Sequence, residues 1–231
     1  MEPHGPIVLF GSGESTPGGR RVWEWLFERV PLPPRVALLE TPAGFEPNSA
    51  EVAGEIARFL RHRLQNYTPQ TTVIPARKRG TPHSPDNPEL VAPLPTSNVI
   101  FMGPGSPTYA VRQLRESVAW HTLRACQRLG AALVLASATT VACSAWAMPV
   151  YEIYKVGEEL HWQPGLDLFG DYGLDMVWVP HWNNRDGGDK LDTSRCYLGE
   201  ERFERLRALL PDGPVVAGVD EQTAVVIAPR R

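Results

Sequence analysis

Residues 131–140 read AALVLASATT, and this stretch joins an apolar run to a serine and a segment that can continue as a helix. The run 131–136 is short and uninterrupted, which is typical of a strand buried on both faces of a parallel sheet. Ser137 follows it directly. A serine at a strand-to-helix turn has the geometry of a nucleophile elbow, in which a sharp turn exposes the side chain. The alternative is that Ser137 only caps the following helix.

Similar apolar runs recur along the chain, each ending at Gly, Pro or small residues, at 7–10, 36–39, 71–74, 99–102 and 176–179. Amphipathic segments with helical periodicity lie between them, at 21–29, 49–64, 108–114, 118–129 and 200–210. This alternation predicts an α/β fold, a doubly wound and mostly parallel sheet with helices on both faces, in a flavodoxin-like arrangement. Two last runs, 215–218 and 223–227, are close enough in sequence to predict a β-hairpin.

The alternation continues through all 231 residues and predicts one domain, 1–231. It is interrupted by a proline-rich segment at about 75–95, with prolines at 75, 82, 85, 88, 93 and 95. We expect this segment to be a long irregular loop inside the domain, because it falls within the strand–helix alternation.

Charge and cysteine content exclude several classes of function. The chain has 23 Lys and Arg against 26 Asp and Glu, a net charge of −3, which argues against a nucleic-acid binder. Three scattered cysteines form no C-x-x-C pair, and free thiols fit a reducing compartment. No apolar run is long enough to span a membrane, and the N-terminal residues lack a signal-peptide pattern. We therefore expect a cytoplasmic protein that binds neither nucleic acid nor membranes.

Ligands of doubly wound sheets bind outside the carboxyl ends of the strands, so the residues that follow each strand are the candidates for a site. Besides Ser137, three segments qualify: GSGES at 11–15, GPGS at 103–106 and HWNN at 181–184. His181 is the natural base for Ser137, because the pKa of histidine lies near neutrality. Asn183, Asn184 and Arg195 are candidates for binding a substrate carboxylate or amide.

Neither a cofactor nor a metal is predicted. The segment 11–16 lacks the third glycine of a G-x-G-x-x-G fingerprint, since Thr16 stands in its place, and no P-loop lysine follows. The carboxylates of 181–192 do not follow the D-x-D-x-D spacing of a calcium loop. These segments are better explained by tight turns and a hydrogen-bonded surface loop.

Together these segments resemble the dipeptidase E and cyanophycinase group of serine peptidases, within the class I glutamine-amidotransferase-like superfamily. The resemblance spans nearly the whole chain and rests on GSGE at 11–14, MGPG at 102–105, SA at 137–138, PH at 180–181 and GVDEQTA at 218–224. The last segment resembles the closing G-x-D-E-x-T-A pattern of the group and is the most specific match.

The resemblance implies that Ser137 is the nucleophile and His181 its general base, with the N–H groups of Ala138 and Gly103 forming the oxyanion hole. The third member implied is an acidic residue between the serine and the histidine, or close to them in space. Glu152 is the first candidate, ahead of Glu158 and Asp175. The substrate-binding edge implied by the same resemblance includes Gly13, Glu14, Gly105 and Glu221, with Glu221 orienting polar groups.

One departure separates this chain from the group. The elbow of the group reads close to G-x-S-A-G, whereas Leu135 and Thr139 stand here two residues before and after Ser137. Either the turn is remodelled, or this branch has lost hydrolysis and kept the pocket.

The sequence therefore predicts a serine hydrolase that cleaves a small peptide or amide. The alternative is a non-catalytic member that binds an acidic or amide-bearing metabolite, or a protein partner, in the same crevice. Amide transfer is disfavoured, because a serine stands where an amidotransferase has its cysteine. A homodimer is a hypothesis that rests only on the frequency of twofold dimers among soluble proteins.

Overall fold

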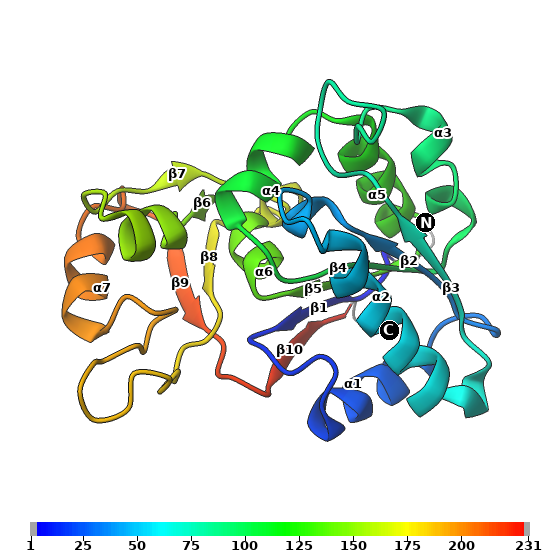
Figure 1. Cartoon of the computed structure of the whole chain (residues 1–231), viewed down its shortest axis with the longest axis horizontal. Helices are drawn as coiled ribbons and strands as arrows, with labels where there is room; N and C mark the ends of the chain where they lie inside the picture. The colour runs from blue at the N-terminus through cyan, green and yellow to red at the C-terminus, as the bar shows by residue number, and fades with distance from the viewer. Residues whose placement is uncertain (1–3, 229–231) are drawn as a thin grey trace.

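The computed structural model describes residues 4–228 and contains a six-stranded sheet in the order β10-β1-β5-β4-β2-β3 (Figure 1). Its strands are β1 (Ile7–Phe10), β2 (Arg35–Leu39), β3 (Gln70–Ile74), β4 (Val99–Met102), β5 (Ala132–Ala136) and β10 (Ala224–Ile227). All neighbouring strands are parallel except β10, which pairs antiparallel with β1. The mostly parallel sheet, surrounded by helices, confirms the predicted α/β fold.

Alternate strand residues supply two cores, one on each face of the sheet. Val8 and Phe10 pack on one face with α1 (Pro17–Phe27) and α2 (Ser49–Arg63). Ile7 and Leu9 pack on the other with α4 (Pro107–Leu114), α5 (Val118–Arg128) and α6 (Ala138–Ala142). Because successive strand side chains point to opposite faces, strands covered on both faces must be apolar throughout, as β1, β4 and β5 are.

Three of the helices that surround the sheet begin at side-chain caps that the sequence supplies. Thr16, Ser106 and Ser117 each accept a hydrogen bond from a backbone N–H of the first turn of α1, α4 and α5. Proline stands at the start of α1 and of α4, where its missing N–H has no intrahelical partner to lose. This signal explains why α1 begins four residues before the predicted position.

The predicted hairpin of 215–218 and 223–227 is wrong. Strand β9 (Val215–Gly218) pairs in parallel with β8 (Met176–Val179), while β10 joins β1 in the central sheet. The two-stranded sheet β8–β9 lies beside the central sheet with α7 (Glu200–Arg207), near the short pair β6 (Trp146–Ala147) and β7 (Gln163–Pro164) (Figure 1). Residues 219–223 therefore form not a hairpin turn but a bridge between two sheets.

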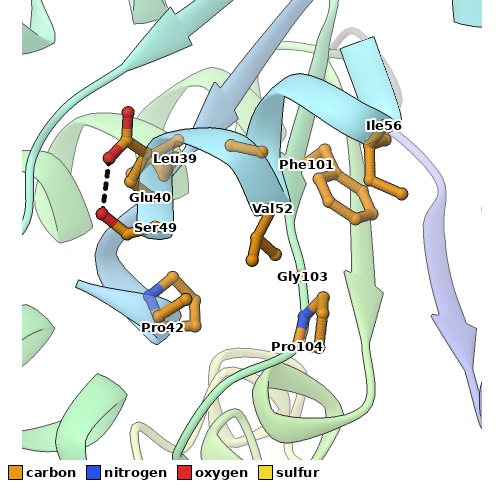
Figure 2. Close-up of a pocket in the computed structure, with 11 residues that line it drawn as sticks. Leu39, Glu40, Pro42, Ser49, Val52, Ile56, Phe101, Gly103 and Pro104 are labelled. Atoms are coloured by element: carbon orange, nitrogen blue, oxygen red, sulfur yellow. Dashed lines mark hydrogen bonds between the residues drawn. The ribbon is translucent and has the colours of Figure 1, made fainter. Parts of the chain in front are cut away.

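The proline-rich segment is more ordered than a simple loop. It contains the short helix α3 (Pro88–Val91) and the turn η3 (Leu94–Thr96), and both Val91 and Leu94 are buried in the core. The start of the segment is fastened by Arg77, whose Nε donates to buried Glu40 at 2.6 Å. Ser49 of α2 donates to the same carboxylate at 3.0 Å (Figure 2).

Shorter turns complete the chain: η1 (Thr41–Ala43), η2 (Gln65–Tyr67), η4 (Glu152–Val156) and η5 (Phe169–Tyr172). Among the helices of residues 4–228, none combines the length and apolarity needed to cross a bilayer.

Candidate active site

Ser137 stands in a strained turn between β5 and α6. Its φ is 53° and its ψ −110°, a conformation that residues other than glycine rarely adopt. The Ser137 N–H donates to the carbonyl of Phe10 on β1 at 3.3 Å. Strain of this kind persists only where neighbouring contacts hold it, and such residues are concentrated at functional sites.

The bulky residues that flank the serine are built into the turn. The buried hydroxyl of Thr139 donates to the carbonyl of Met102 at 2.6 Å and accepts from the N–H of Ala136 at 3.1 Å. Thr140 Oγ1 donates to the Phe10 carbonyl at 3.0 Å. Leu135 is fully buried in the core. The elbow conformation therefore forms with Leu135 and Thr139 in place of small residues, because threonine hydroxyls tie α6 to β4, β5 and β1.

His181 meets Ser137 from the end of β8. Ser137 Oγ and His181 Nε2 are 2.9 Å apart, within hydrogen-bond distance. His181 also has a positive φ of 51°, and its N–H donates to the Gly11 carbonyl after β1 at 3.2 Å. The structure thus brings together the predicted nucleophile and its predicted base from segments 44 residues apart.

The acid on the far side of His181 is Glu221, which corrects the expectation for Glu152. Glu221 Oε1 lies 2.9 Å from His181 Nδ1. Glu152 instead accepts a hydrogen bond from the Thr108 hydroxyl on α4, and its second oxygen is buried without a partner. Glu221 lies in the bridge between β9 and β10, so its position depends on the strand pairing that the sequence did not predict.

Asn183 and Asn184 hold this acid rather than face a substrate. Asn184 is 1% exposed and donates from Nδ2 to Glu221 Oε1 at 2.8 Å. Asn183 Oδ1 accepts from the backbone N–H of Glu221, also at 2.8 Å. One asparagine thus orients the carboxylate, and the other holds the turn that carries it.

Arg195 is also engaged within the protein. Its guanidinium carbon lies 4.1 Å from the centre of the Trp182 ring, and its Nη1 donates to the Trp182 carbonyl at 3.2 Å. Its Nη2 contacts Glu200 at 3.3 Å. Both terminal nitrogens are thus engaged within the protein, while Nε is buried without a hydrogen-bond partner among residues 4–228, and a role of Arg195 in binding a substrate carboxylate stays a prediction.

The glycine-rich turns lie around the same edge of the sheet. Gly105 has a φ of 144°, and a Cβ there would lie 2.1 Å from the Pro42 carbonyl oxygen, so only glycine fits. A Cβ on Gly103 would lie 2.8 Å from the Phe101 ring. Ala138 follows the elbow as the first residue of α6, where the N–H has no intrahelical acceptor. Pro104 between the glycines has no N–H to donate.

Gly13 and Glu14 form the turn after β1. Gly13 has a φ of 79°, and its carbonyl accepts from the Thr16 hydroxyl at 2.7 Å. The Glu14 side chain is buried, and burial raises its pKa against the opposing effects of a backbone hydrogen bond and of nearby His181. The Glu14 carbonyl accepts from Trp23 Nε1 at 2.9 Å, which fixes the turn against α1.

Ser137 and His181 open into a cleft of about 510 Å³, which we call the outer cleft. Its walls carry Tyr151, Tyr154 and Tyr197, with Lys155 and Asp186 as its charged residues besides His181. By contrast, the recess of Figure 2, behind Gly103, has a volume of only about 10 Å³, which leaves no room for a substrate.

Tyr197 is held in the outer cleft by a left-handed turn. Arg195, Cys196 and Tyr197 have φ values of 56°, 58° and 71°, a run that L residues avoid. The Tyr197 ring centre lies 5.3 Å from that of His181 and 5.9 Å from that of Tyr154. Burial, followed by the charge of Asp186, raises the pKa of Tyr197. Sequence reasoning missed these tyrosines, because no motif marks them.

In the part of the chain that the structure describes, no three His, Cys, Asp or Glu side chains are grouped in a way that could hold a metal ion. The polar groups at the site instead form a hydrogen-bonded series from Ser137 to His181 to Glu221. Such an arrangement can activate a hydroxyl as a nucleophile.

The similarity of this chain to known proteins lies in its structure. No family model matches the chain, and no curated protein matches it. Among solved structures it is similar to a peptidase from an acI-B1 Actinobacterium, with a TM-score of 0.75, 21% identity, and coverage of 98% of this chain and 84% of that chain. It is also similar to a "Putative Peptidase E Protein" from Listeria monocytogenes EGD-e, with a TM-score of 0.63, 14% identity, and coverage of 99% and 96%. At these identities the similarity establishes a shared fold.

Proposed function

We propose that this protein is a serine hydrolase that cleaves a small peptide or amide through Ser137, His181 and Glu221. The observation that carries the proposal is the continuous hydrogen-bonded chain from Ser137 Oγ to His181 Nε2 and from His181 Nδ1 to Glu221 Oε1, with 2.9 Å at each step. The strained conformation of Ser137 and the peptidase structures with the same fold support it.

Each group has a defined task in the proposed reaction. Ser137 Oγ attacks the carbonyl carbon of the substrate and passes its proton to His181 Nε2, so that a tetrahedral intermediate forms. His181 then gives that proton to the leaving amine as the C–N bond breaks, which leaves an acyl group on Ser137. Water then attacks the acyl group and gives a proton to His181 Nε2, so that a second tetrahedral intermediate forms. His181 returns this proton to Ser137 Oγ as the ester bond breaks, which releases the carboxylic acid. Glu221 stabilises the imidazolium through Nδ1–H.

The negative charge on the substrate oxygen needs donors at the start of α6. The N–H of Ala138 is available there, and Gly103 remains the proposed second donor. Pro104 lacks an N–H, so it cannot take this part.

Labelling with a fluorophosphonate tests the proposal without knowledge of the substrate. The probe phosphonylates an activated serine, and mass spectrometry should locate one adduct on Ser137. The Ser137→Ala variant should remain unlabelled, whereas Ser194→Ala should be labelled like the unchanged protein, since the partner of Ser194 is Asp192, outside the series Ser137–His181–Glu221.

An unlabelled but folded protein would contradict the hydrolase and favour the alternative, a non-catalytic member that binds a small acidic or amide-bearing metabolite or a protein partner. Thermal unfolding in parallel shows whether each variant is folded.

A further inference from the structure

A second, smaller pocket opens directly beside Ser137, and we call it the inner pocket. Its apolar walls are Pro107 of α4, Val141 of α6, and Val150 and Cys196 from the loops opposite. Val141 and Val150 are 1% and 4% exposed, so this wall of the pocket belongs to the core, whereas Tyr151 on its lining is exposed. Neither a motif nor a charge pattern in the sequence marks it.

The inner pocket is small. Its volume is about 30 Å³, against about 510 Å³ for the outer cleft. A site needs roughly 10–15 Å³ on this measure to admit one water molecule. The inner pocket therefore has room for a group of about one to two carbon atoms, and a longer chain would have to displace the buried valines.

The lining consists of apolar side chains, two tyrosines, Ser137 and His181. No Lys, Arg, Asp or Glu side chain contributes to its walls. Burial, followed by the charge of Glu221, raises the pKa of Cys196 to about 12, so its thiol is neutral at physiological pH. A charged substrate group in this pocket would lose its hydration without gaining a partner, which is strongly unfavourable.

The position of the pocket indicates which part of a substrate it would take. In the proposed reaction the leaving group receives its proton from His181. The loop that follows His181 supplies Asp186 and Gly187 to the outer cleft. The inner pocket is instead enclosed by the starts of α4 and α6, on the side of Ala138. Ser137 and His181 line both pockets, but only the inner pocket includes Ala138, beside the proposed oxyanion donor, where an acyl group bonded to Ser137 would lie.

We propose that the inner pocket is the acyl subsite and that it selects a small, uncharged aliphatic group, of the size of an acetyl or propionyl unit. This inference rests on the proposed function and specifies its substrate class. Val141 and Val150 then determine specificity by limiting the depth of the pocket.

A series of p-nitrophenyl esters with one common leaving group tests the inference. The compounds are the acetate, the butyrate, the hexanoate and the hydrogen succinate, each corrected for its own rate of alkaline hydrolysis. Because one methylene in an apolar pocket changes kcat/KM by about tenfold or more, we expect at least that fall between acetate and hexanoate. We expect a similar or larger fall for the charged succinate.

Enlarging the pocket should change the preference. In Val141→Ala and Val150→Ala the ratio of kcat/KM for hexanoate to that for acetate should rise by about tenfold. Val36→Ala is the matched control, since Val36 is equally buried but packs on the opposite face of the sheet. The ratio within one preparation does not depend on the fraction of folded enzyme, so a destabilised variant remains informative.

The outcomes separate the two proposals. If esters acylate Ser137 but hexanoate or succinate reacts as well as acetate, or if neither valine variant changes the ratio, the acyl subsite is overturned while the hydrolase stands. If neither esters nor the fluorophosphonate modify Ser137, the hydrolase fails, and the acyl subsite fails with it.

Discussion

Glu221 is a chemically suitable acid whose place in the chain does not point to this role, because it follows His181 instead of lying between Ser137 and His181. It contacts His181 Nδ1 at 2.9 Å, and Asn183 and Asn184 fix both its backbone and its carboxylate. Glu152 lies between Ser137 and His181 in sequence, but it points to Thr108 on α4. At the scale of the residue, the contacts of the carboxylate decide which acid serves the histidine.

Replacing Glu221 should therefore impair the reaction far more than replacing Glu152. In Glu221→Gln the amide can force His181 into the wrong tautomer, so we expect kcat to fall by about 10²–10⁴-fold. The measurement is kcat for hydrolysis of p-nitrophenyl acetate, with thermal unfolding as a check on folding.

Glu152→Gln is the matched control, because it makes the same chemical change in a carboxylate that does not contact His181. Its kcat should stay within about twofold of the unchanged protein, since no lost contact touches the reacting groups. A larger fall for Glu152→Gln than for Glu221→Gln would restore the acid first predicted from the sequence.

The elbow between β5 and α6 is held by side chains as well as by backbone. Thr139 joins the end of β5 to the end of β4, and Thr140 joins α6 to β1. α6 is only five residues long, too short to be stable without such contacts. At the scale of the element, the hydroxyl groups of these threonines hold the strand-to-helix turn in place.

Removing the Thr139 hydroxyl should destabilise this element. Thr139→Val keeps the shape but leaves the Met102 carbonyl and the Ala136 N–H without this partner in a buried site, so the free energy of unfolding should fall by about 1–3 kcal/mol. Urea unfolding measures the change. Thr72→Val on edge strand β3 is the control, because Thr72 is exposed, and its effect should be within about 0.5 kcal/mol.

An elbow that depends on Thr139 should also lose reactivity. We expect slower fluorophosphonate labelling of Ser137 in Thr139→Val even where the protein is fully folded. Unchanged stability and labelling would show that the turn is held by the backbone alone.

Across the whole molecule, an ion-pair network ties the segment between the two small sheets to the central layer. Asp171 of η5 pairs with Arg124 and Arg128 of α5, with Arg124 Nε at 2.9 Å and Arg128 Nη2 at 3.0 Å. Although burial alone would raise the pKa of Asp171, the two guanidinium groups lower it below its ordinary value. Tyr172 next to it bonds to Gln127 of the same helix.

This network makes stability depend on pH in a definite direction. Because the folded pKa of Asp171 is lower than the unfolded pKa, the carboxylate stabilises the fold fully above the unfolded value, near 4. That contribution is lost as the pH falls through the folded pKa. Asp171→Asn should therefore lower the free energy of unfolding by about 1 kcal/mol at pH 7, and by progressively less below pH 4.

Urea unfolding at pH 7 and at pH 3 measures the difference. Asp212→Asn, an exposed acid in the turn before β9, should have little effect at either pH. A deficit for Asp171→Asn that is equal at both pH values would show that packing, and not charge, stabilises this contact.

The central fold follows from local sequence signals. Apolar runs such as 99–102 and 131–136 mark strands buried on both faces, and the periodicity of 49–64 marks α2, because side-chain direction repeats every two residues in a strand and every 3.6 in a helix. The place of the elbow at Ser137 could be predicted for the same reason, since a strand, a turn and a helix follow one another in the chain, whereas the contacts of Thr139 and Thr140 with β4 and β1 that hold it could not. Strand and helix periodicity are properties of neighbouring residues, so a single sequence is enough to predict them.

Only the tertiary structure determines which segments far apart in the chain become partners. Strands β9 and β10 have apolar patterns that fit either a hairpin or two separate sheets, and long-range pairing chooses between them. That choice carries Glu221 to His181 and leaves Glu152 at α4. The inner pocket likewise arises where side chains of α4, α6 and two loops meet. Such contacts join residues that no local pattern connects, so their chemistry becomes visible only when the chain is folded.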